Sequence, residues 1–181
     1  GLVLVICIVW AGNLVSGKVA MEHFSPFLFM TLRFILVLLL LLPFLRMPPP
    51  GQWGTMVFVS LMIGALHFTF LFWALAWSQD VSSVGIILQT YIPLSVLLAM
   101  LLMGERVGGA TLAAIFFTFL GVMVVGFDPL VLSQPDVLAI TLGAALFQAL
   151  GSIYQRRISG IGVLSFQAWI ALIALPVMMI A

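Results

Sequence analysis

Long apolar runs, broken by short polar or proline-containing turns, fill almost the whole chain. A helix needs about 20 apolar residues to cross the ~30 Å hydrocarbon core of a bilayer. By this measure the pattern predicts about seven membrane-spanning helices, over Leu2–Met21, Pro26–Leu45, Gly54–Trp77, Val81–Met103, Val107–Phe127, Val137–Gln155 and Ile161–Ala181. The sequence therefore predicts an all-α membrane protein built as a multi-helix bundle.

Local signals mark the ends and bends of these segments. Ser25 followed by Pro26 is typical of a helix start, with a capping hydroxyl and proline at the first helical position. The proline-rich run Met47–Gly51 cannot continue a helix. Pro93 falls in the middle of the fourth predicted span, where we expect a kink that serves either packing or gating.

Composition supports a membrane protein and excludes several other classes. Hydrophobic residues make up 65% of the chain and charged residues only 6%, whereas a soluble domain carries about 25% charged residues. A net charge of +1 without a clustered basic face argues against a nucleic-acid partner. The single Cys7 gives neither a disulfide framework nor a cysteine metal site. We expect no metal and no cofactor.

The loop charges predict an orientation, because lysine and arginine favour the cytoplasmic side. If the N-terminus is cytoplasmic, the inner loops carry Arg46, Arg106, Arg156 and Arg157, and the outer loops carry Asp80, Asp128 and Asp136. We therefore place the N-terminus in the cytoplasm. Both ends of the chain fall inside apolar runs, so we expect a piece of a longer protein.

An internal repeat is also visible. The stretches Trp10–Lys18 and Phe147–Arg156 carry polar and aromatic residues in a similar order, each followed by a turn and another span. Five predicted spans separate the two copies, so the second runs through the membrane upside down. Inverted repeats are typical of secondary transporters. The chain then divides into a five-helix repeat (1–128), a linker (129–136) and the start of a second repeat (137–181).

Polar residues inside the predicted spans mark a candidate substrate site, since such residues are costly in lipid and usually face the interior of a bundle. Counting ~1.5 Å per residue places four of them roughly 9–15 Å below the outer surface, namely Lys18, Arg33, His67 and Gln89. Three more fall nearer the midplane, namely Asn13, Tyr91 and Gln148. We predict that this layer binds substrate, and we find no catalytic group.

Each of these residues has an alternative interpretation. Lys18 could extend to the outer interface, and Arg33 could tie helices together by a salt bridge instead of contacting substrate. His67 is either a hydrogen-bonded interhelical residue or a proton carrier. Gln89 and Gln148 are equally compatible with interhelical hydrogen bonds. No Asp or Glu lies in the middle of a span, so proton coupling would need His67 or groups elsewhere.

A series of short motifs follows along the chain: Trp10-Ala-Gly-Asn with Lys18, Ser25-Pro26, Leu32-Arg33-Phe34, Val81-Ser82-Ser83-Val84, Gly104-Glu105-Arg106 and Leu120-Gly121-Val122. In this order and spacing the chain resembles the EamA family of the drug/metabolite transporter (DMT) superfamily. The resemblance implies ten helices arranged as two inverted five-helix repeats. It also implies an integral protein of the bacterial inner membrane that exports small metabolites.

The resemblance narrows the expected function further. The stretch His67–Phe72, together with Ile87–Gln89, is most similar to members that export amino acids such as cysteine and O-acetylserine. We expect a transporter and not an enzyme, working by alternating access between lipid-embedded repeats on a small substrate that carries a carboxylate. Nucleobases, sugars and drugs are alternative substrate classes. A non-transporting scaffold and an intramembrane enzyme are more distant alternatives.

Overall fold

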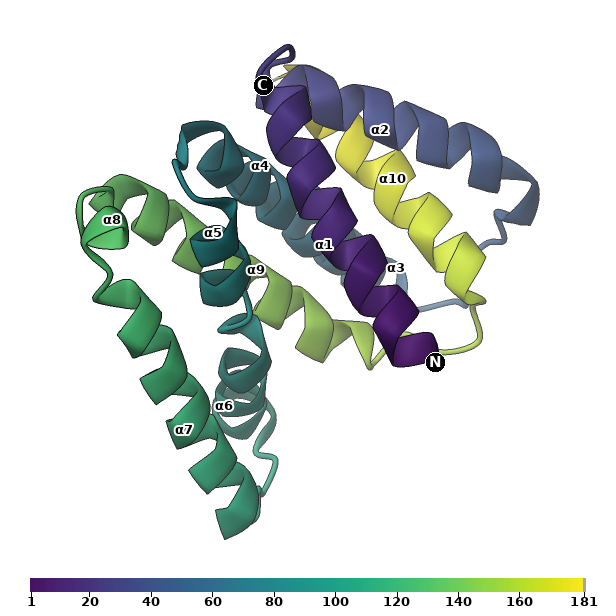
Figure 1. Ribbon diagram of the computed structural model, residues 1–181. Coiled ribbons are helices and arrows are strands. Elements are labelled where there is room, and N and C mark those ends of the chain that lie inside the picture. The colour runs from purple at the N-terminus through teal and green to yellow at the C-terminus, as the bar shows by residue number, and fades with distance from the viewer. Residues whose placement is uncertain (181) are drawn as a thin grey trace.

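The computed structural model describes residues 1–180, apart from the side chains at positions 125, 126 and 130. The described part is helical and contains no strand (Figure 1). In chain order the elements are α1 (Leu2–Met21), α2 (Pro26–Leu41), η1 (Leu42–Phe44), α3 (Trp53–Val59), η2 (Ser60–His67), α4 (Phe68–Trp77), α5 (Val81–Leu88), α6 (Tyr91–Met103), α7 (Gly109–Gly126), α8 (Pro129–Leu132), α9 (Pro135–Gln155) and α10 (Val163–Ile180). The predicted all-α fold class is confirmed.

Within the described residues, six helical segments are long and apolar enough to cross a membrane, and α7 contributes a shorter apolar helix. Their limits differ from the sequence prediction by a few residues. The sixth span begins at Pro135 and the seventh at Val163, while Ala181, the predicted end of the seventh, lies outside the described residues. The predicted linker contains the short helix α8.

The third span, formed by α3, η2 and α4, is the centre of the bundle. It packs against α9 and α10, and α10 also lies along α2 (Figure 1). Helix α1 packs against α4 and α5, and α7 runs beside α5 and α6 at the edge away from α2 and α10. The helices of the predicted second repeat therefore share most of their contacts with spans two, three and four.

Glycine residues let the central helices approach closely. A Cβ atom on Gly64 of η2 would lie 2.8 Å from Cγ2 of Ile170 and 2.9 Å from Cβ of Ala174, both on α10. A Cβ atom on Gly151 of α9 would lie 2.3 Å from Cγ1 of Ile63. Because lipid gives apolar helices little reason to associate, close packing at small residues is a main source of stability between them.

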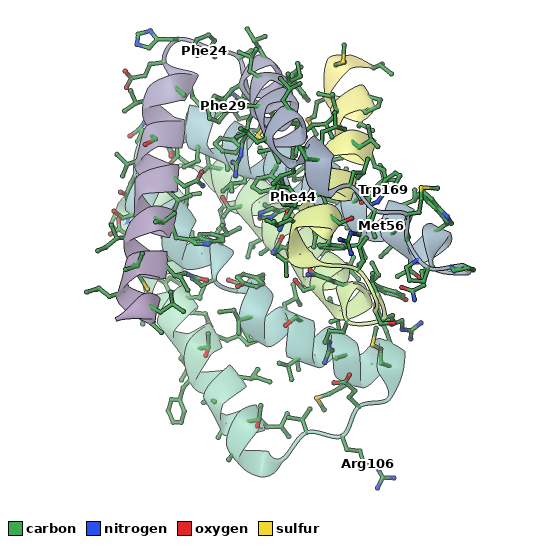
Figure 2. The ribbon with its side chains drawn as sticks, turned by 90° about the vertical axis from the view of Figure 1, so that its right-hand side faces the viewer. Phe24, Phe29, Phe44, Met56, Arg106 and Trp169 are labelled. Carbon is green, nitrogen blue, oxygen red and sulfur yellow. The ribbon has the colours of Figure 1, made fainter. Side chains whose placement is uncertain are left out.

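The two ends of the bundle are distinct. Figure 2 shows Phe24, in the turn between α1 and α2, at the opposite end from Arg106, which projects from the turn after α6. Between these two ends, Met56 of α3 is buried in a cluster with Trp169 of α10 (Figure 2). The Trp169 indole donates a 2.8 Å hydrogen bond to the carbonyl of Arg46. This contact ties the proline-rich loop to the last helix.

The fourth span is broken where its proline predicts a kink. Helix α5 ends at Leu88 and α6 begins at Tyr91, two residues before Pro93. Proline has no N–H to donate to the preceding turn, so the helix cannot run through this point undisturbed. At the break, the hydroxyl and the amide of Thr90 both donate to the carbonyl of Ile87, and the amide of Ile92 donates to the carbonyl of Gln89. Residues at the break, Gln89, Tyr91 and Ile92, line a groove beside α1.

Candidate functional site

Arg33 of α2 is the most unusual charged group in the bundle. Its guanidinium carbon lies 4.7 Å from the centre of the Phe68 ring and 5.7 Å from that of Phe72, both on α4. Its Nη1 atom is buried and has no hydrogen-bond partner among the described residues. Stacking on a ring occupies the face of the guanidinium and leaves its edge N–H groups available as donors. Arg33 thus presents an unsatisfied donor inside the bundle.

His67 connects the Arg33 region to α9. Its side chain is buried, and its Nδ1 atom lies 2.9 Å from the carbonyl oxygen of Ala144. A carbonyl can only accept, so Nδ1 carries the proton in this contact and Nε2 is the acceptor of the neutral ring. The ring centre also lies 4.9 Å from that of Phe68, on whose ring Arg33 stacks. Three helical elements therefore meet around this histidine.

Gln148 lies one helical turn beyond Ala144 on α9, so the two residues share a face. Its Oε1 atom is buried and has no hydrogen-bond partner among the described residues. A buried polar group left unpaired costs about 1–3 kcal/mol. An unsatisfied acceptor on α9 therefore accompanies the unsatisfied donor of Arg33.

Ser60 is a third such group, and the sequence analysis did not select it. It begins η2, its side chain is fully buried, and its Oγ atom has no partner among the described residues. The only signal in the sequence was a hydroxyl in the interior of an apolar span. Segment η2 is a π-helix, a conformation that is rare and frequently found at functional sites.

Lys18 has a different environment from Arg33. Its ammonium donates to three carbonyl oxygens at the end of α4, those of Leu75, Ala76 and Ser78, at 2.9, 3.4 and 2.6 Å. A cation at this place satisfies carbonyls that have no partner in the helix and complements the negative end of the helix dipole. The described contacts of Lys18 are therefore those of a helix C-cap.

The remaining candidates lie beside α1. Gln89 and Tyr91, on either side of the α5–α6 break, line a groove of about 640 Å³ whose other wall includes Trp10 and Leu14 of α1. This volume lies within the range of small-molecule sites. Asn13 is on the same helix and is partly buried. The structure thus separates the predicted layer into buried polar groups inside the bundle (Arg33, His67 and Gln148), the helix cap at Lys18 and the groove beside α1.

The described residues contain no group of three or more His, Cys, Asp or Glu side chains that could hold a metal ion. The free Cys7 is exposed.

Comparison with known proteins gives one family and one relative. Residues 1–127 match the family described as the EamA-like transporter family. Over 179 residues, 95% of this chain, the sequence is 28% identical to a protein of Salmonella typhimurium strain LT2 named "Probable amino-acid metabolite efflux pump". The chain spans 59% of the length of that relative. No solved structure matches the chain.

Proposed function

Because the chain belongs to the EamA-like transporter family, we propose that it forms part of a secondary transporter that exports small carboxylate-bearing metabolites, amino acids among them. Alternating access between the two inverted repeats would move the substrate. The apolar composition and the six spanning helices support a membrane location. The similarity to a protein named as an amino-acid metabolite efflux pump supports the direction and the substrate class.

The observation that carries this proposal is the buried, unpaired Nη1 atom of Arg33. A charged group taken out of water without a partner is strongly unfavourable, and natural proteins rarely keep one. The one salt bridge in the described residues joins Arg156 and Glu105, and it does not involve Arg33. A carboxylate on the substrate would supply the missing partner through a charge-assisted, two-point hydrogen bond.

The other unpaired atoms support a substrate that also carries an amino group. Gln148 offers a carbonyl oxygen and Ser60 a hydroxyl, and both atoms are buried without partners. Each can accept a hydrogen bond from an ammonium group. The bundle thus offers a guanidinium for a carboxylate and oxygen acceptors for an ammonium, the two kinds of group that bind an amino acid.

Orientation and coupling belong to the same proposal. The arginines of the loops favour an N-terminus in the cytoplasm of a bacterial inner membrane. His67 is buried next to the Phe68 ring, on which Arg33 stacks. It is the candidate proton carrier if export is coupled to protons. Replacing it by Gln would then remove the dependence of export on the proton gradient.

A transport assay on the full-length protein tests the proposed function. Inside-out vesicles expose the cytoplasmic face, so an exporter accumulates added radiolabelled L-cysteine. We expect Arg33→Leu to reduce the initial rate about 100-fold, because truncating one partner of a buried charge pair costs roughly 2–5 kcal/mol. Arg33→Lys, which keeps the charge, should retain part of the rate. Unchanged transport in Arg33→Leu would contradict the proposal.

A further inference from the structure

A second cavity opens at the end of the bundle where Arg106 projects. It has a volume of about 270 Å³ and is lined by Ser95, Val96, Ala99, Glu105, Ser152, Ile153 and Arg156. Its lining includes none of the buried residues around Arg33. One wall comes from α6 and the turn that follows it, and the other comes from the last turn of α9 and from Arg156, which follows it. The cavity therefore lies where the two predicted repeats face each other.

An ion pair joins the two walls. The Nη1 atom of Arg156 lies 3.2 Å from Oε1 and 3.4 Å from Oε2 of Glu105. The two side chains remain 55% and 44% exposed. An exposed pair of this kind contributes only about 0–1 kcal/mol. A ligand that carries both a negative and a positive group could separate the pair at little cost and satisfy each charge.

Polar residues continue along α9 beyond the cavity. Arg156, Ser152 and Gln148 follow one another at intervals of four residues, so they form a row along one face of the helix. Ala144, one turn further, is the residue whose carbonyl contacts His67. The polar row therefore leads from the ion pair at the surface to the buried, unpaired oxygen of Gln148.

We propose that this cavity is an entrance site that takes a small zwitterion before it reaches the buried site around Arg33. Its anionic group binds Arg156 and its ammonium group binds Glu105, while the Ser152 hydroxyl lies at the inner end. Val96, Ala99 and Ile153 line the cavity and suit a short aliphatic side chain. The identification of this ligand with the transported substrate rests on the proposed function. The existence of the site does not depend on it.

The loop arginines place this end of the bundle on the predicted cytoplasmic side. An exporter collects its substrate on that side. A weak site, easily emptied, is what an entrance requires, since tight binding there would hold the solute back from the centre of the membrane.

Protection of a thiol tests the entrance site without relying on transport. The full-length protein, purified in detergent with its native cysteines changed to serine, receives the single substitution Ser152→Cys, and its rate of modification by a maleimide is measured. We expect L-alanine at ten times its dissociation constant to slow modification about tenfold, because the free fraction falls as 1 + [L]/Kd. Alaninamide, which lacks the carboxylate, and propionate, which lacks the ammonium, should each protect far less.

Two variants separate this inference from the proposed function. Arg156→Gln should abolish the protection, whereas Arg33→Leu should leave it intact even though transport is lost. Equal protection by the two singly charged analogues, protection that survives Arg156→Gln, or a thiol that the maleimide does not reach would each overturn the inference. If L-alanine protects Ser152→Cys without a further substitution but the wild-type protein transports no amino acid, only the proposed function would be contradicted.

A lipid headgroup that carries a phosphate and an ammonium shares the chemistry of the proposed ligand. Phosphatidylethanolamine is therefore added to the micelles in a parallel series without L-alanine. We expect no protection by this lipid. Protection by the lipid and none by L-alanine would show that the cavity holds a headgroup, and would overturn its assignment as an entrance for solutes.

Discussion

The first and third spans are equally hydrophobic but very differently packed. Each has a mean hydropathy of 2.0, yet 6% of the apolar window of α1 is buried, against 50% of the window from Trp53 to Trp77. Hydropathy therefore places both segments in lipid without saying which is central. The third span is distinguished by its small and polar residues, such as Gly64 and His67, which contact α10 and α9.

The comparison extends to the two embedded cations. Lys18 of α1 is satisfied by carbonyl oxygens at the end of α4, whereas Arg33 of α2 lies over Phe68 with an unpaired donor. Both were predicted at the same depth of the membrane. Depth alone therefore does not separate these two environments, whereas the pairing of each polar atom does.

Overpacking the third span should give the largest fall in thermal midpoint. In Gly64→Val the new side chain would meet Ile170 and Ala174 at under 3 Å, and such overpacking costs about 1–3 kcal/mol or more. We expect a clear fall in the thermal midpoint of the full-length protein in detergent, followed by circular dichroism. Gly12→Val is the matched control, because a Cβ atom on Gly12 of α1 meets nothing within 4 Å. Equal effects of the two substitutions would remove the distinction between the spans.

Removing the cap that Lys18 provides should have a smaller effect on stability. A cation at a helix C-terminus contributes about 0.3–1 kcal/mol, and up to ~2 kcal/mol where it is partly buried, as Lys18 is. Lys18→Met should therefore lower the thermal midpoint less than Gly64→Val does. Lys18→Arg, which can still donate to the carbonyls of α4, should recover most of the loss. A Lys18→Met protein as stable as the wild type would show that this cap is unimportant.

The smallest fall in thermal midpoint should come from Asp80→Ala, which removes the cap at the start of the fourth span. The Asp80 carboxylate caps α5 by accepting from the N–H groups of Ser82 and Ser83 at 3.0 and 2.9 Å. The Ser83 hydroxyl, which also donates to this carboxylate, is the main reason that the pKa of Asp80 lies below its usual value. Replacement of such a cap by Ala costs about 1 kcal/mol.

The sign of the pH dependence follows from this lowered pKa. The stabilisation by Asp80 is complete above the ordinary aspartate pKa of about 4 and is lost as the pH falls through the lower value of the folded state. The difference in thermal midpoint between wild type and Asp80→Ala should therefore be constant from neutral pH to about 5 and shrink in stronger acid. A difference that grows in acid would contradict this assignment.

Much of the fold could be predicted from the sequence, because span length and apolar content are set by the bilayer. The starts at Pro26 and Val81, and the break before Pro93, follow from local chemistry and lie where expected. The π-helical turn of the third span had no such signal. It packs against α9 and α10, which lie far away in the sequence.

The candidate site was less predictable. Residue type and depth drew attention to Arg33, His67 and Gln148, which lie on contacting elements. They could not separate Lys18 from this group, because its partners are backbone carbonyls, which every residue carries. Ser60 was missed for the opposite reason, since a buried serine in a helix usually bonds to its own backbone and only the structure leaves its hydroxyl unpaired.

Equilibrium binding of radiolabelled L-cysteine to the purified full-length protein tests the central claim, that Arg33 binds substrate while Lys18 supports the fold. We predict that Arg33→Leu weakens binding about 100-fold with little change in thermal midpoint. Lys18→Met should lower the thermal midpoint and leave the dissociation constant within about twofold, since it removes no substrate contact. Unweakened binding in Arg33→Leu, or a loss of binding confined to Lys18→Met, would contradict the account.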